Sequence, residues 1–281
     1  MDDIKIITAY CIIDDVMRKL GHKSHCLAGV TDAEVLTVAV VSALYFQNHH
    51  ERTLFVMKGM RYITKPLSIS RFSRRLHALG QWLEGIVELI CSMFAQGEAF
   101  IIDSIPVPVC KRVRAARCAK IGIIAITDGK RLPPRPYYGY CTAKKEKFYG
   151  WRLHLICTRE GIPVAFQMLP AGLHDLTAIH ELTFQLSEGA CVYADKAYNS
   201  GEAEAAIMEE SGVRLIPKRR ADMKPNSFEE WCDLKWYRHA IETVNSQLEK
   251  MGIQRLHART NEGLALKVLA SMLALLCANL Y

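Results

Sequence analysis

The sequence predicts a mixed α/β fold, in which helices flank a mixed β-sheet, preceded by an all-helical region. Apolar residues recur at helical spacing up to about residue 95, and runs rich in branched and aromatic residues begin at residue 99. Helix-like and strand-like segments alternate after residue 174. At 281 residues and 50% hydrophobic composition, the chain can fill one large or two modest cores. We therefore expect a helical region over 1–95 and an α/β domain over 96–281.

Three helices are expected in the first region, over residues 3–20, 31–46 and 68–94. Thr31 and Glu34 stand in the capping-box relationship that opens the second helix.

The third of these segments carries a basic face, made by Arg71, Arg74 and Arg75 opposite its apolar stripe. A short polar turn followed by an Arg-rich helix is typical of a helix-turn-helix that contacts DNA. A solvated basic face is an equally open alternative. We treat the three arginines as candidate DNA contacts.

The α/β region reads as strand, long basic loop, two-stranded hairpin, and then alternating helices and strands before two final helices. A start of three strands followed by alternation implies a mixed sheet with helices on both faces. The expected segments are 99–103, 148–158, 159–170, 174–186, 190–195, 200–211, 212–219, 236–251 and 263–281. The last segment is long and apolar enough for a membrane span, but Lys267, Ser271 and Asn279 interrupt it. A helix buried in the domain is therefore expected, without a membrane partner.

Positive charge is concentrated in one segment, residues 111–152. It holds 12 basic residues against Asp128 and Glu146, a net +10 where the whole chain carries +7. Aromatic residues are interleaved with them, so the segment offers both phosphate partners and stacking surfaces. The alternative is a solvated loop. The candidate DNA contacts here are Lys111, Arg112, Arg114, Lys144 and Lys145.

Three carboxylates are placed to meet in such a sheet. Asp103 and Asp195 each follow a short apolar strand, and side chains beyond strand ends form the sites of α/β sheets. Glu242 borders the apolar stripe of the helix at 236–251, one step from Ile241. Taken singly, each acid is better explained as a strand end, a turn or a solvated helix position than as a site residue. Taken together, they form a three-carboxylate cage.

Carboxylate oxygens suit Mg²⁺, which takes one or two carboxylates and keeps water and phosphate ligands. Two such ions stabilise the attacking and leaving oxygens of an in-line displacement at phosphorus.

The order of elements resembles the ribonuclease H-like fold, and the sequence resembles bacterial DDE transposases of insertion sequences. The nearest resemblance is to the insertion-sequence nine-eighty-two family, and it covers nearly the whole chain. It rests on "IIDSIPVPV", "KFYGWRLHLICTREGIPVAFQMLPAGLHD", "YADKAYNS" and "RHAIETVNSQLEKMG".

This resemblance implies that Asp103, Asp195 and Glu242 form the catalytic triad and hold two Mg²⁺ ions, for which Mn²⁺ can substitute. It implies that Arg238 and Lys250 contact DNA near the site. Lys196, beside the second aspartate, is a further candidate DNA contact. The implied activity is binding of terminal inverted repeats, 3′-end cleavage and strand transfer.

The implied partner is double-stranded DNA, both element ends and target, bound by a homodimer or larger synaptic complex. Two alternatives stay open: a catalytically inactive or repurposed DNA-binding protein, and a structure-specific nuclease of the same fold. Ten cysteines without a CxxC pair, and an acidic rather than basic start, lead us to expect the cytoplasm, at the bacterial nucleoid.

Overall fold

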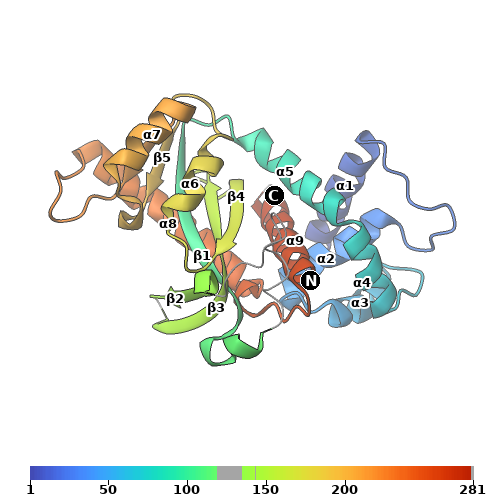
Figure 1. Ribbon diagram of the computed structural model, residues 1–281. Helices are drawn as coiled ribbons and strands as arrows, with labels where there is room; N and C mark the ends of the chain where they lie inside the picture. Colours follow the sequence, from blue (N-terminus) through green and yellow to red (C-terminus); the bar gives the residue numbers. More distant parts are fainter. Residues whose placement is uncertain (119–134, 143, 280–281) are drawn as a thin grey trace. The chain divides into compact units, whose positions relative to one another are not determined.

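The computed structural model describes residues 1–118, 135–142 and 144–279 (Figure 1). The chain forms two compact units. The helical unit comprises Met1–Leu89 together with the chain from Gln247 onward, and the sheet unit comprises Ile90–Ser246.

The helical unit contains α1 (Asp3–Lys19), α2 (Asp32–Phe46), α3 (His50–Gly59), α4 (Ile69–Ala78) and α9 (Asn261–Asn279). Helix α2 is buried on almost every side, which its small and branched, mostly apolar residues permit. Its predicted capping box is confirmed: Thr31 accepts a hydrogen bond from the Glu34 amide, and Glu34 accepts one from the Thr31 amide.

The last part of the chain belongs to the helical unit, which differs from the division expected at residues 95 and 96. Helix α9 contacts α2 along its length, and Figure 1 shows the two side by side. Asn48, after α2, donates hydrogen bonds of 3.0 Å from its side-chain amide to Met251 O and to Ser271 Oγ. Helix α9 has the length and hydropathy of a membrane span, yet 67% of its most apolar window is buried in the protein. It is a core helix, as predicted.

Residues 68–94 form two helices rather than the single helix expected. Helix α4 ends at Ala78 with Leu79 as its C-cap, and α5 (Gly80–Phe94) starts at a glycine. A Cβ on Gly80 would lie 3.2 Å from the Leu266 side chain, so the missing side chain admits close approach by α9. Helix α3 was not predicted.

Over its described residues, the sheet unit contains one sheet of six strands. The strand order is β2-β3-β1-β5-β6. Strand β4 pairs with β3 on the same edge as β2, over residues 151–157. Strand β3 pairs antiparallel with β1, β2 and β4, whereas β1, β5 and β6 run parallel to one another. The strands are β1 (Ala99–Lys111), β2 (Tyr138–Cys141), β3 (Glu146–Cys157), β4 (Pro163–Pro170), β5 (Cys191–Ala194) and β6 (Arg214–Pro217). The predicted mixed sheet is therefore confirmed, and its ribonuclease H-like relationship stays a prediction. The predicted hairpin is β3–β4, with Gly161 at φ +82° in its turn.

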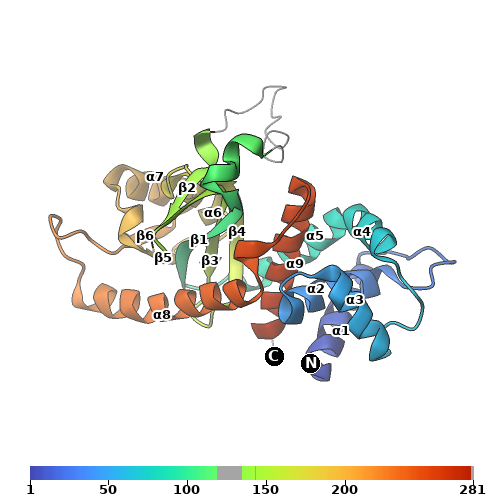
Figure 2. The same cartoon turned by 90° about the horizontal axis from the view of Figure 1, so that it is seen from below.

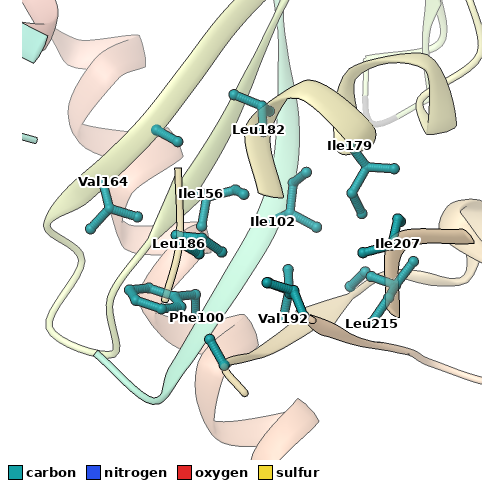
Figure 3. Close-up of a cluster of buried hydrophobic side chains, with 14 of the residues drawn as sticks. Phe100, Ile102, Ile156, Val164, Ile179, Leu182, Leu186, Val192, Ile207 and Leu215 are labelled. Carbon is teal, nitrogen blue, oxygen red and sulfur yellow. The ribbon is translucent and has the colours of Figure 1, made fainter. Parts of the chain in front are cut away.

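Helices cover both faces of the sheet. One face buries a core against α6 (Leu176–Thr183) and α7 (Gly201–Ser211), with Phe100, Ile102 and Leu215 among its members (Figure 3). The other face carries α8 (Phe228–Lys250), seen lengthwise in Figure 2. On this face the Tyr193 ring of β5 stacks on Tyr237 of α8 at 4.8 Å between ring centroids, and its hydroxyl donates 2.6 Å to Asp233.

Candidate active site

Asp103 and Asp195 occupy equivalent places on neighbouring parallel strands. The β1–β5 pairing ends at Ile102 opposite Ala194, and the next residue in each case is an aspartate, Asp103 within β1 and Asp195 just after β5. The sequence suggested that Asp103 ends its strand, which is wrong. Strand β1 continues to Lys111 through its pairing with β3. The strand that ends at this point is β5, whose last residue is Ala194. Asp103 therefore lies just beyond the paired part of β5, where it lines a pocket. The two carboxylates therefore lie at the same carboxyl edge of the parallel pair.

Helix α8 adds the third acid. Ile241 and Val244 are 2% and 1% exposed, which confirms the apolar stripe, and Glu242 lies beside it with 61% of its side chain exposed. Arg238, one turn earlier, donates from Nε to Glu242 Oε1 at 2.8 Å. In this ion pair the positive charge of Arg238 faces the acid that the metal site would need.

One pocket of about 340 Å³ joins these groups, and all of it lies within the sheet unit. Its charged lining consists of Asp103, Asp195, Glu242, Lys218, Lys235 and Arg238. Its apolar lining consists of Ile101, Ile102, Ala194, Trp231, Leu234 and Ile241. The structure thus brings the three predicted acids to one pocket and sets three cations around them.

The environment of Asp103 opposes its ionised form. Burial raises its pKa to about 6, and the nearby charges of Asp195 and Asp175 add to this effect. Two hydrogen bonds act in the opposite direction: the Ser104 amide donates to Oδ1 at 2.8 Å, and Asn245 Nδ2 donates to Oδ2 at 2.9 Å. A cation bound close to Asp103 would therefore stabilise the ionised form of this carboxyl.

The donor set suits a hard divalent cation, although the acids are not drawn together around one point. Mg²⁺ takes one or two carboxylates and keeps other oxygens as ligands, which the Asp103–Asp195 edge can supply. Among the described residues, no three His, Cys, Asp or Glu side chains are grouped closely enough to hold a metal ion. Glu242 would have to leave Arg238 to join the two aspartates.

A second layer of polar groups lies behind Asp103 on the other side of β1, and the sequence reasoning did not find it. Ser104 Oγ donates to Asp175 Oδ1 at 3.3 Å and receives Arg152 NH1 at 3.0 Å. His154 Nδ1, 1% exposed, lies 4.0 Å from the same Asp175 oxygen, and burial lowers the His154 pKa to about 4. Asp175 precedes α6 but makes no capping hydrogen bond there. The available clue was strand alternation, since Ser104 and His154 are opposite residues of β1 and β3.

The pocket also contains Lys218, Lys235 and Trp231, which sequence reasoning did not single out as site residues. Lys218 follows β6, the next parallel strand, so it reaches the same edge as Asp195. Residues that follow parallel strands could have been searched for cations as well as acids.

The predicted DNA contacts of the sheet unit are solvent-exposed where the structure describes them. These are Lys111, Arg112, Arg114, Lys144, Lys145, Lys196 and Arg238. Arg112 lies over the Tyr138 ring at 5.9 Å, and Lys111 Nζ lies 3.8 Å from Glu146. Residues 119–134 of the predicted basic loop lie outside the described residues. Lys250 belongs to the helical unit and does not line the pocket.

The three arginines of α4 have different surroundings. Arg75 donates to Val30 O at 2.8 Å and to Asp32 at 2.5 Å, so its guanidinium holds the chain before α2. Arg71 and Arg74 are exposed and line a cavity of about 500 Å³ in the helical unit. The helix-turn-helix and its DNA contacts stay a prediction.

Comparison with known proteins identifies the family. Residues 95–262 match the family model described as "Transposase DDE domain". No curated protein sequence matches the chain. Among solved structures, a Mos1 transposase paired-end complex with left transposon end shares 12% identity at a TM-score of 0.24, covering 84% of this chain and 82% of that one. A pre-cleavage Mos1 transpososome shares 10% identity at a TM-score of 0.25, covering 82% and 80%. The family match spans more than half of the chain, and the protein therefore belongs to the transposase DDE domain family.

Proposed function

We propose that this transposase binds the terminal inverted repeats of an insertion sequence, cleaves their 3′ ends and joins them to target DNA. One observation carries the proposal: Asp103, Asp195 and Glu242 line the same pocket, although they come from three separate elements. Cations surround them, as a polyanionic substrate requires.

Asp103, Asp195 and Glu242 would hold two Mg²⁺ ions, or Mn²⁺ in their place. Bound there, the ions would supply charge stabilisation for the attacking and leaving oxygens of a displacement at phosphorus. The chain's own residues prepare this site. Asn245 orients Asp103 through its amide, and Arg238 holds the Glu242 carboxylate by a hydrogen bond from its Nε.

The cations of the pocket would receive the DNA backbone. Lys218 and Lys235 stand beside the acids and can bind phosphates next to the one attacked. Arg238 can exchange its carboxylate partner for a phosphate, since more than half of both side chains is exposed and exposed ion pairs are weak.

The test is incubation of purified full-length protein with a duplex that carries the element end, with Mg²⁺ and with EDTA. We expect a metal-dependent nick at the 3′ end and, with target DNA added, a joined product. A gel shift without any nick, unchanged in Asp103→Asn, would indicate a DNA-binding protein without catalysis. Cleavage that ignores the end sequence and yields no joined product would indicate a nuclease of the same fold.

We further infer a relationship to the bacterial insertion-sequence nine-eighty-two family, on the four segments quoted above. The protein would then act at the nucleoid in the cytoplasm, as a homodimer or larger complex that holds two DNA ends. Short inverted repeats in the DNA flanking the coding sequence would support this inference, and size measurement on end-bearing DNA would test the assembly.

A further inference from the structure

Trp231 is an exposed tryptophan in the wall of the pocket that holds the three acids. It lies in the first turn of α8, and 52% of its surface is exposed to solvent. It lines the pocket together with Asp103, Asp195 and Glu242. An indole offers a large apolar area whose exposure to water is unfavourable, so its position beside charged groups is better explained by a ligand than by folding.

The surroundings of Trp231 suit a ligand that is both aromatic and anionic. Lys235 Nζ lies 5.5 Å from the centroid of the indole, and Lys218 and Arg238 line the same pocket. Phe228 lies on the same helix, with its ring centroid 6.3 Å from that of Trp231 and the ring planes 23° apart. A purely apolar ligand would leave these cations without a partner, whereas a nucleotide carries an aromatic base for the indole and a phosphate for the cations.

We propose that Trp231 is a stacking platform for an unpaired base of the DNA strand whose phosphodiester enters the pocket. This inference rests on the proposed function, and it specifies the form of DNA that the site accepts. A base within a duplex is already stacked on its neighbours, so only a base in a single-stranded tail, or one turned out of the helix, can use the indole.

The cation over the ring does not obstruct this binding. Lys235 has a long flexible side chain and is exposed, and a cation–π contact at an exposed site is weaker than the stacking of a base. When a base covers the indole, the Lys235 ammonium can move to the adjoining phosphate. One nucleotide would then be held at both its base and its phosphate.

Trp236 provides a matched control on the same helix. It is also exposed, at 60%, but it does not line the pocket, and the Arg159 guanidinium lies over its ring at 4.3 Å. The two tryptophans are five positions apart, which places them about 140° apart around a helix. Substitution of either tryptophan removes a similar exposed side chain, so unfolding would affect both variants alike.

The experiment compares three DNA probes without divalent metal: a short blunt duplex, the same duplex with a single-stranded 3′ tail, and one whose tail is abasic. The abasic tail retains the phosphates but has no bases to stack. For wild-type protein we expect tighter binding of the tail with bases than of the abasic tail, by about five- to one-hundred-fold. We expect that ratio to fall to about one in Trp231→Ala, to persist in Trp231→Phe, and to stay at its wild-type value in Trp236→Ala.

Equal binding of the two tailed probes by wild-type protein, or an unchanged ratio in Trp231→Ala, would overturn the inference. Quenching of tryptophan fluorescence by the tail gives an independent readout, and its survival in Trp231→Ala would overturn it too. Neither result affects the proposed function, which depends on metal-dependent cleavage and joining of element ends. Conversely, base-dependent tail binding without any cleavage would leave the stacking site in place and reject the enzyme.

Discussion

Asn245 of helix α8 donates a 2.9 Å hydrogen bond to the carboxylate of Asp103 on strand β1. This bond links the helix that carries Glu242 to the strand that carries the first aspartate. It also satisfies one oxygen of a carboxyl that burial disfavours in its charged form.

The first prediction concerns the pH dependence of stability. Folding raises the Asp103 pKa from 3.8 to about 6, so the folded protein binds this proton more tightly than the unfolded chain. The protonated carboxyl therefore stabilises the fold below pH 4, and this contribution is lost as the pH rises through 6. We expect Asp103→Asn to raise the metal-free free energy of unfolding at pH 7 by about 2–3 kcal/mol, with a gain near zero at pH 4.

Urea unfolding at a series of pH values measures this difference. The Asn245 amide can turn to face the new side chain, because its Oδ1 accepts no hydrogen bond from the described residues. Asp195→Asn, at an exposed position, is the control and should change stability much less. A gain in Asp103→Asn that persists at pH 4 would mean that charge is not its cause.

The second prediction concerns Glu242. Glu242→Gln keeps the size of the side chain but weakens its affinity for a cation, so metal-dependent cleavage should fall by at least about a hundredfold while DNA binding is retained. The exposed ion pair with Arg238 should contribute less than about 1 kcal/mol to stability. Cleavage kinetics, gel shifts and thermal unfolding check the three parts. Glu249→Gln, on the same helix but outside the pocket, is the comparison variant, and full activity in Glu242→Gln would remove Glu242 from the site.

The third prediction concerns the basic segment. Arg114 and Lys144 are exposed, and each that contacts a phosphate should contribute about 0.9 to the slope of log K against log salt concentration. Arg114→Gln and Lys144→Gln should therefore weaken binding at low salt and flatten that slope. Arg18→Gln removes the same charge from α1, where the arginine is paired with Asp14, and should leave the slope unchanged. Equal slopes in all three variants would make the segment an ordinary solvated surface.

The fourth prediction concerns the helical unit. Asn48 is 1% exposed and holds Met251 O and Ser271 Oγ, so Asn48→Ala would leave buried polar groups without their donor. We expect a loss of about 2–3 kcal/mol in the free energy of unfolding, measured by denaturant titration. Asn48 also has φ +63°, where glycine is unstrained. Asn48→Gly should thus be less destabilising than Asn48→Ala by about 1 kcal/mol. A neutral Asn48→Ala would show that this residue does not secure the C-terminal segment.

Local patterns were sufficient for much of this protein. The capping box of Thr31 and Glu34, the β3–β4 hairpin and the apolar stripe of α8 depend on residues close together in the chain, and each was predicted. The three acids were selected because each has a recognisable local setting, two following apolar strands and one beside an apolar stripe. Their chemical type then indicated a metal-dependent phosphoryl reaction.

Other features depend on contacts between distant segments, and only the tertiary structure decided them. Helix α9 follows the catalytic region in the chain, yet its apolar surface is buried against α2 in the helical unit. Strand β1 extends beyond Asp103 because β3 supplies hydrogen-bond partners up to Lys111, which no local pattern in β1 records. For the same reason, only the tertiary structure shows that Asn245 and Trp231 belong to the site. The burial and hydrogen bonding of a side chain depend on which distant residues surround it.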